Sequence, residues 1–262
     1  MSAPAPPPAD PAAPTPPKVA KRRVNDILLG RFERWALPRM ATRLPAWMTP
    51  DGLTAIALAG ALLSSVAYAL SGENLAWLHV ASFGLVVHWW GDSLDGTLAR
   101  VRQIRRERYG FFVDHQADAI AAVLLTVGLG AGSLMRLDIA MLICVGVLMM
   151  MLLVNMVTIA RDVFKISFGG LGPTELRVIA IVFNTVVWAV GPTTVSWRGV
   201  EWTVLDLLGL FGVGLLALMW TVSVVRETRL IGRLDPTPTP GQDGQAFDPT
   251  GQNVGSDTQT AA

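Results

Sequence analysis

Six long apolar segments follow one another between residues 53 and 225, separated by short polar connections. Each is close to the ~20 residues that an α-helix needs to cross ~30 Å of hydrocarbon. The second is long enough only if its helix continues through the polar residues after it as far as Arg100, and we expect that it does. The segments are residues 53–71, 75–91, 112–132, 137–160, 176–196 and 202–225. The pattern therefore predicts an all-α integral membrane protein with six transmembrane helices.

The stretch before the first apolar segment combines apolar and basic residues. Its apolar side chains alternate with arginines: Ile27, Leu28, Phe32, Trp35 and Leu37 with Arg31, Arg34, Arg39 and Arg43. An amphipathic helix of this kind, at residues 25–45, can lie on an anionic membrane surface or pack on the protein, and both interpretations stay open. The six-helix catalytic domain is placed at residues 46–232. Residues 1–24, which are Pro-rich, and 233–262 are expected to be disordered.

Composition and charge distribution support a membrane location and give it an orientation. Hydrophobic residues make up 52% of the chain and charged residues 16%, and the mean hydropathy is +0.45. Lysines and arginines number eight before the first segment, five between the second and third, three between the fourth and fifth, and three after the sixth. The other connections hold only Arg136 and Arg198. By the positive-inside rule both termini face the cytoplasm, in the bacterial inner membrane we expect. We expect the lipid bilayer as a partner and no nucleic acid.

Four aspartates lie around the connection between the second and third apolar segments. Asp92 and Asp95 are three residues apart, and Asp114 and Asp118 are four apart. On a helix either spacing places both side chains on one face, so two neighbouring helices can bring all four carboxylates together. Carboxylates that close repel one another unless cations lie between them. Oxygen-only ligands predict a hard ion such as Mg²⁺, Mn²⁺ or Ca²⁺.

Glycines and arginines beside the aspartates indicate what such ions would hold. Gly96 and Gly110 have no side chain, so a bulky ligand can approach the backbone closely. Arg100 and its neighbours supply cations for phosphate oxygens. Two divalent ions flanked by such groups can clamp a diphosphate for phosphoryl transfer. At the cytoplasmic end of membrane helices, the site can take a soluble nucleotide from one side and a lipid from the other.

These residues resemble the signature of the CDP-alcohol phosphotransferases. All eight signature positions match, as Asp92-x-x-Asp95-Gly96-x-x-Ala99-Arg100, nine residues, then Gly110-x-x-x-Asp114-x-x-x-Asp118. The resemblance covers about residues 46–230 and implies six membrane helices, a cytoplasmic site, two Mg²⁺ or Mn²⁺ ions and a homodimer. It also implies that an acceptor alcohol attacks the β-phosphorus of a CDP-linked donor and that CMP leaves.

The resemblance further implies a role for each matched residue. Asp92, Asp95 and Asp114 would be metal ligands, and Asp118 a ligand, the general base or both. The residues implied to line the cytidine and the diphosphate are Gly96, Ala99, Arg100 and Gly110. The segment Thr49-Pro50-Asp51-Gly52-Leu53-Thr54 resembles the family's Pro-Asn-x-x-Thr, which makes Asp51, in place of asparagine, and Thr54 nucleotide-binding candidates. A helix start with no ligand role explains the same segment.

Two features favour the branch that transfers a phospho-head group from CDP-choline or CDP-ethanolamine to a lipid alcohol such as diacylglycerol or ceramide. The Asp-His-x-x-Asp of eukaryotic choline and ethanolamine phosphotransferases is matched around His115, a candidate general base. Residues 168–175 resemble the loop before their Thr-Glu, so Glu175 is a candidate for the head group. Leu176-Arg177 departs from the expected apolar-Gln pair. An interfacial imidazole and an ordinary helix start are the alternatives.

Other functions remain open from the sequence. In the second branch CDP-diacylglycerol donates a phosphatidyl group to a polar alcohol, and the signature does not separate the branches. A transporter would also place carboxylates among six helices, but transporter sites lie near mid-bilayer on interrupted helices. A scaffold without catalytic activity is a third class. His88, one turn before Asp92, is expected to pack in the bundle.

Overall fold

The computed structural model describes residues 29–161, 173–197 and 199–235, and in these ranges the chain forms seven helices and one β-hairpin. The helices are α1 (Gly30–Arg43), α2 (Pro50–Leu70), α3 (Trp77–Val101), α4 (Glu107–Ala131), α5 (Leu137–Arg161), α6 (Pro173–Val190) and α7 (Val204–Leu234). Strands β1 (Thr194–Trp197) and β2 (Val200–Thr203) pair antiparallel between α6 and α7. The all-α fold class is confirmed. The predicted disordered tail at residues 1–24, the start of the predicted amphipathic helix at 25–28, and residues 236–262 of the predicted C-terminal tail lie outside the described ranges.

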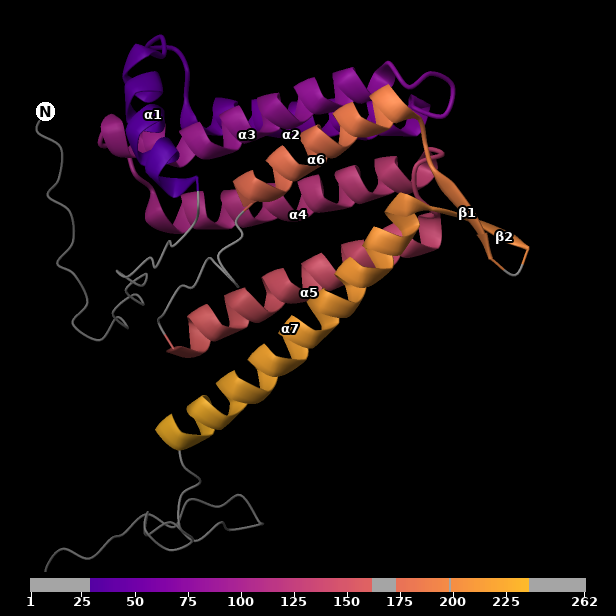
Figure 1. Cartoon of the computed structure of the whole chain (residues 1–262). Coiled ribbons are helices and arrows are strands. Elements are labelled where there is room, and N and C mark those ends of the chain that lie inside the picture. The colour runs from indigo at the N-terminus through magenta and orange to yellow at the C-terminus, as the bar shows by residue number, and fades with distance from the viewer. Residues whose placement is uncertain (1–28, 162–172, 198, 236–262) are drawn as a thin grey trace, which may run out of the picture.

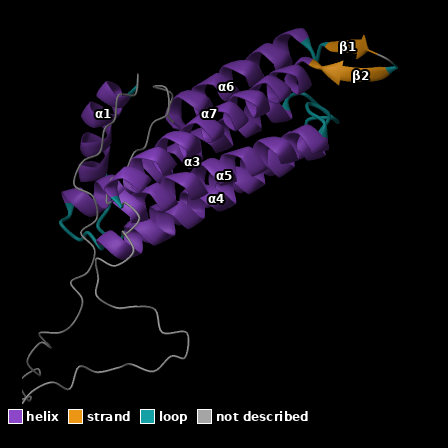
Figure 2. Ribbon diagram, turned by 90° about the horizontal axis from the view of Figure 1, so that it is seen from below, coloured by secondary structure: helices purple, strands orange, loops and turns teal. Residues whose placement is uncertain are grey.

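The helices α2 to α7 run side by side, and each connection reverses the direction of the chain (Figure 1, Figure 2). Helix α3 packs on α2 and α6, α2 packs also on α4, and α5 lies between α4 and α7. Both views show α1 lying across the end of this bundle at which α2 begins and α3 ends. We call this end of the bundle the site end, because two signature aspartates lie in the last turns of α3 and the other two lie near the start of α4. The β-hairpin lies at the opposite end.

The outer faces of the bundle are apolar, as the surroundings of a lipid bilayer require. Five of the described helices are long and apolar enough to cross a membrane: α2, α4, α5, α6 and α7. Large apolar side chains remain exposed on them, including Leu152, Ile159 and Phe211. These observations identify an integral membrane protein. Helix α3 has the length, 25 residues, but its carboxylates and histidines make it less apolar, so its place as the sixth span stays a prediction.

Two element boundaries differ from the sequence prediction. The fifth apolar segment was expected to form one helix to residue 196, but α6 ends at Val190 and Gly191 follows with a φ of 86°, where glycine is favoured. The apolar residues after it belong to the hairpin. Helix α7 runs 31 residues to Leu234, past the predicted end at 225. Its start is fixed by Thr203, which forms a capping box with Asp206.

A fully buried carboxylate joins the connections at the opposite end. Asp206 is 0% exposed, and its oxygens accept hydrogen bonds from the backbone N–H groups of Thr203 (2.8 Å) and Arg136 (2.7 Å). The Thr203 hydroxyl donates to the Leu134 carbonyl oxygen at 2.8 Å. The connection before α5 is thereby attached to the start of α7.

Helices α2 and α3 approach so closely that their backbones touch. A Cβ added at Gly91 of α3 would lie 2.5 Å from the Leu53 carbonyl oxygen and 2.7 Å from the Ala57 amide nitrogen, both in α2. Backbone atoms cannot move aside as a flexible side chain can. Small residues at such positions are what allow membrane helices to pack at short distance. This contact fixes α3 on α2 one residue before Asp92.

We predict that Gly91→Ala destabilises the protein by about 1–3 kcal/mol, the usual range for overpacking. Gly212→Ala in α7 is the control, because its new methyl group would meet no atom within 4 Å. Thermal unfolding of both variants in detergent measures the effect. Equal unfolding temperatures for the two variants would contradict the tight α2–α3 contact.

Candidate active site

A pocket of about 1010 Å³ opens at the site end and is lined by residues of α1, α2, α3, α4, α6 and the α3–α4 connection. Every site residue predicted from the sequence lines it, with Glu175 as the exception. The predicted residues in its wall are Asp51, Thr54, Asp92, Asp95, Gly96, Ala99, Arg100, Gly110, Asp114, His115 and Asp118. The fold therefore brings both halves of the signature to one volume, as the three- and four-residue spacings predicted.

Asp95 is held by α2 and by its own helix. The Thr54 hydroxyl donates to Asp95 Oδ2 at 2.7 Å, and the Gly96 backbone N–H lies 2.5 Å from Oδ1. Hydrogen bonds to an ionised carboxylate are about twice as strong as those between neutral groups. Thr54, predicted as a nucleotide-binding residue, thus also orients an aspartate of the signature.

Asp92 is held by α6. Arg177 Nη2 lies 2.8 Å from Asp92 Oδ2, and the same nitrogen lies 3.0 Å from His88 Nε2. His88 is 4% exposed, which agrees with its predicted packing role. Sequence analysis noted Arg177 only as a departure from the expected glutamine and did not place it in the site.

The α4 half of the site carries Asp114, His115 and Asp118. Asp118 is repelled by the charges of Asp92, Asp114 and Asp95, the other signature carboxylates. His115 Nδ1 lies 2.8 Å from the Phe111 carbonyl oxygen, which can only accept, so Nδ1 carries the hydrogen and Nε2 the lone pair. The Phe111 carbonyl thus fixes the His115 ring, and the role of His115 as a general base stays a prediction.

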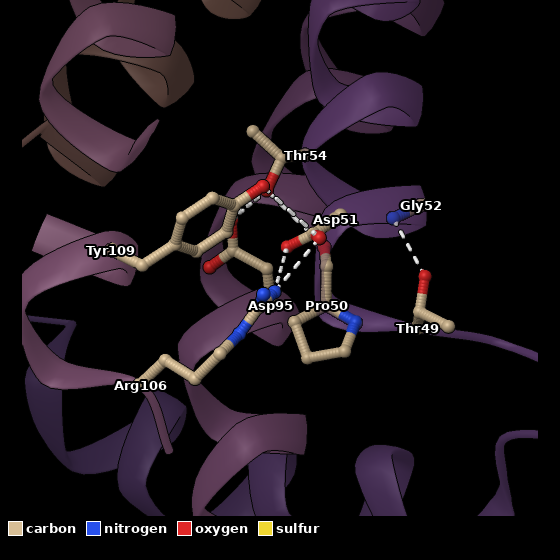
Figure 3. A network of polar contacts seen from close by, with 8 residues as sticks. All are labelled: Thr49, Pro50, Asp51, Gly52, Thr54, Asp95, Arg106 and Tyr109. Atoms are coloured by element: carbon tan, nitrogen blue, oxygen red, sulfur yellow. Dashed lines mark hydrogen bonds and ion pairs between the residues drawn. The ribbon is translucent and has the colours of Figure 1, made fainter. Parts of the chain in front are cut away.

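Asp51 joins α2 to the start of α4 at the mouth of the pocket (Figure 3). Its carboxylate accepts from Arg106 Nη2 at 2.9 and 3.2 Å and from the Tyr109 hydroxyl at 3.2 Å. The Arg106 guanidinium also stacks 3.9 Å from the centroid of the Tyr109 ring. Thr49 caps α2 by accepting from the Gly52 amide at 3.0 Å. The segment of residues 49–54 is therefore a helix start, and its Asp51 also lines the pocket.

Arg102 holds the connection that leads into α2. Its guanidinium donates to four backbone carbonyl oxygens of this connection, those of Leu44, Pro45, Ala46 and Met48. Arg102 ends α3, and Gln103 follows with a φ of 56°. The amide of Ile104 then bonds the Ala99 carbonyl at 3.0 Å, which completes a Schellman-type turn. This turn directs the next arginines toward the pocket.

Helix α1 forms a wall of the pocket and is fastened to two other helices. Glu33 Oε1 accepts from the Trp89 indole N–H (3.2 Å) of α3 and from the Thr174 hydroxyl (2.5 Å) of α6. The Leu29 amide donates to Glu175 Oε1 at 2.8 Å. The residues of α1 that line the pocket are Gly30, Glu33, Arg34, Leu37 and Pro38.

Helix α1 packs on the domain, whereas its predicted role at a membrane surface stays a prediction. Leu37 and Ala41 are buried and belong to a core cluster with Leu94 and Leu98 of α3. On other faces Phe32 and Trp35 are more than half exposed. Helix α1 packs on the domain and keeps aromatic side chains available to a membrane interface.

Glu175 is the candidate that the pocket does not include. It is 6% exposed and lies beside the start of α1, where it accepts from Leu29. Its neighbours Pro173, Thr174 and Arg177 line the pocket instead. A contact between Glu175 and a donor's ammonium group stays a prediction.

The donor set fits divalent metal, although the carboxylates do not share one point in this conformation. Among the described residues, no three His, Cys, Asp or Glu side chains are close enough together to hold one ion. The four aspartates nevertheless line one pocket, and carboxylate oxygens are the ligands that Mg²⁺ and Mn²⁺ prefer. The chemistry of the donors and their shared pocket are therefore what support a divalent metal here.

Comparison with known sequences found one matching family. The sequence profile of the CDP-alcohol phosphatidyltransferases matches residues 47–225. The chain belongs to the CDP-alcohol phosphatidyltransferase family. Members of this family transfer phosphate-containing groups from CDP-alcohols, and they generally depend on divalent metal. A search of curated proteins found no significant match.

The matched segment of this CDP-alcohol phosphatidyltransferase begins between α1 and α2. The wall that α1 contributes therefore lies outside the family profile. Arg106, Tyr109 and Arg177 lie inside it, and sequence analysis assigned none of them an individual role. Arg106 and Tyr109 lie between the two halves of the signature in the sequence. Their proximity to Gly110 could have identified them as candidate site residues. Arg177 had no local signal, because its partners lie about 90 residues earlier in the chain.

We predict that Arg102→Ala lowers stability by about 1–3 kcal/mol, since it removes a shared donor from partly buried carbonyl groups. Arg105→Ala is the matched control, because Arg105 is exposed and pairs only loosely, at 3.8 Å, with Glu107. Thermal unfolding in detergent compares the two. An Arg102→Ala variant as stable as Arg105→Ala would show that the α1–α2 connection does not need this anchor.

Proposed function

We propose that this protein is a metal-dependent membrane phosphotransferase. It moves a phospho-head group from a CDP-alcohol of the CDP-ethanolamine or CDP-choline type to the hydroxyl of a lipid such as diacylglycerol or ceramide, and it releases CMP. The observation that carries the proposal is the single pocket that gathers both halves of the signature at one end of an apolar bundle.

The position of the pocket suits substrates of opposite polarity. Its wall includes charged residues from five helices, whereas the outer faces of the bundle are apolar. A soluble nucleotide can enter at the helix ends, and a lipid can approach along the helices. We infer that α3 is the sixth span and that the site and both termini face the cytoplasm, as the arginine distribution predicts. A site at the helix ends also speaks against a transporter, whose site would lie near mid-bilayer.

In the proposed reaction the acceptor's hydroxyl oxygen forms a bond to the β-phosphorus of the donor. The bond from that phosphorus to the oxygen bridging it to the α-phosphate breaks, and CMP departs with the bridging oxygen. Asp118 or His115 takes the hydroxyl proton, and the Phe111 carbonyl holds the His115 ring in place through Nδ1. Arg100 and Gly96 would bind the diphosphate, and Gly110 would allow the nucleotide close to the α4 backbone.

Two divalent cations, Mg²⁺ or Mn²⁺, would neutralise charge on the attacking and leaving oxygens. Asp92, Asp95, Asp114 and Asp118 would hold them. Thr54 keeps the Asp95 carboxylate turned toward α2. Ala99, Asp51 and Thr54 complete the proposed nucleotide wall. The homodimer implied by the family resemblance stays a prediction.

The alternative function within the family is phosphatidyl transfer from CDP-diacylglycerol to a polar alcohol. Arg177 favours it, because a largely buried guanidinium stands where the choline and ethanolamine branch is expected to have glutamine. A cation near the acceptor suits a phosphorylated alcohol better than a lipid hydroxyl. His115 favours the head-group branch, and we retain that as the first proposal.

We predict that Asp92→Asn and Asp118→Asn each lower metal-dependent CMP release by at least about 100-fold, since each removes a ligand or base. Asp138→Asn is the matched control: it makes the same change at the opposite end, where Asp138 pairs with Arg136. CMP formation by purified protein in detergent with Mg²⁺ or Mn²⁺ is the measurement. Full activity in both site variants would remove the mechanism.

A donor screen tests the branch. Wild-type protein is given CDP-ethanolamine, CDP-choline or CDP-diacylglycerol, each with diacylglycerol, ceramide or polar alcohols as acceptors. We expect CMP from CDP-ethanolamine or CDP-choline when a lipid alcohol is present. Release from CDP-diacylglycerol alone would establish the second branch, and substrate uptake into vesicles without CMP release would establish a transporter.

A further inference from the structure

The Arg177 guanidinium bridges two residues of α3 that lie one helical turn apart. One nitrogen, Nη2, is 2.8 Å from Asp92 Oδ2 and 3.0 Å from His88 Nε2. Such a nitrogen carries two hydrogens and can donate one to each partner. The Arg177 and Asp92 side chains are 12% and 22% exposed, against 59% and 49% for Arg106 and Asp51 at the pocket mouth. Solvent therefore screens the Arg177 pair much less.

His88 is fixed from its other side by α2. Its Nδ1 lies 3.1 Å from the Ala57 carbonyl oxygen, which can only accept a hydrogen bond. Nδ1 must carry the ring hydrogen, and Nε2 then presents its lone pair to Arg177, which can only donate. The two partners together select one neutral tautomer. A continuous series of hydrogen bonds thus runs from the α2 backbone through His88 and Arg177 to Asp92.

The series links helix packing to the orientation of a carboxylate. Arg177 belongs to α6, which packs on α3. It also attracts Asp118, which the other three signature aspartates repel. Docking of α6 therefore places a cation between the two halves of the signature and turns Asp92 toward it.

We propose that Arg177 is a positioning residue for Asp92 and that His88 orients Arg177. This inference rests on the proposed function, because it treats Asp92 as a metal ligand. Arg177 contacts Oδ2, so Oδ1 can face a divalent ion. Metal-ligating carboxylates are commonly held by such a second hydrogen bond, and loss of that partner typically lowers metal affinity 10- to 100-fold.

The opposite effect is expected if the guanidinium competes with the ion for Asp92. Removal of Arg177 would then strengthen metal binding, since one cation would no longer have to displace another. The sign of the change in metal affinity therefore separates positioning from competition. Metal binding can be measured without substrate, so the result does not depend on turnover.

The experiment measures Mn²⁺ binding to purified protein in detergent, from the electron paramagnetic resonance signal of unbound Mn²⁺. We expect Arg177→Gln to raise the apparent Kd at least about 10-fold and His88→Leu to raise it several-fold. The double variant should bind no more weakly than Arg177→Gln alone, because both changes break one series. Arg161→Gln, which breaks a similarly buried pair with Glu227 between α5 and α7, should leave the Kd unchanged.

Folding is checked by size-exclusion chromatography and thermal unfolding. If Arg177→Gln does not fold, Arg177→Lys replaces it: a lysine keeps the charge without the planar fork, and a Kd between wild type and 10-fold weaker is expected. An unchanged or lower Kd in the Arg177 variant overturns the positioning role of Arg177. Additive losses of Mn²⁺ affinity in the double variant overturn the proposal that His88 orients Arg177. Saturable Mn²⁺ binding in wild type with no change in the variants defeats this inference alone. No saturable binding in wild type defeats the proposed metal site and the inference with it.

Discussion

Four carboxylates held in one pocket repel one another, and the neighbouring helices supply the groups that hold them. Arg177 of α6 contacts Asp92, and Thr54 of α2 donates to Asp95. These partners come from two different helices, both of which pack on α3. Contacts from two neighbouring helices therefore offset part of the repulsion inside the site.

The signature carboxylates lie at helix ends, where a charged group costs less than at the centre of a lipid bilayer. A charged group near the centre of a bilayer costs about 2.5–3.5 kcal/mol on insertion scales, and this cost falls near the ends of a span. The signature lies where α3 ends and α4 begins, so its carboxylates reach water while their helices remain largely apolar. The backbone contact at Gly91 holds α3 against α2 just before Asp92. A tight apolar contact therefore stands directly beside the polar site that it positions.

Sequence patterns predicted what local periodicity determines. The apolar runs predicted the helices. The spacing of Asp92 with Asp95 and of Asp114 with Asp118 predicted that each pair shares one helix face, from which neighbouring helices can bring both pairs together. The end of α6 was predicted wrongly, because Val195 and its neighbours in the hairpin continue the apolar run without continuing the helix. The partners of Asp92 could not be predicted at all, since the meeting of His88 and Arg177 depends on how α6 docks. A side chain's partner across the bundle is a property of packing, which periodicity does not encode.

The pocket is lined both by residues inside the family match and by residues of α1, which precede that match. The signature residues on α3 and α4 lie within the segment that matches the family profile. The α1 wall precedes that segment, yet Glu33 fastens it to α3 and to α6. Arg177 is close to Thr174 in the chain, so α1 and Asp92 are both held at the start of α6. The α1 wall of the pocket and the Asp92 carboxylate therefore share one anchor, the N-terminal end of α6.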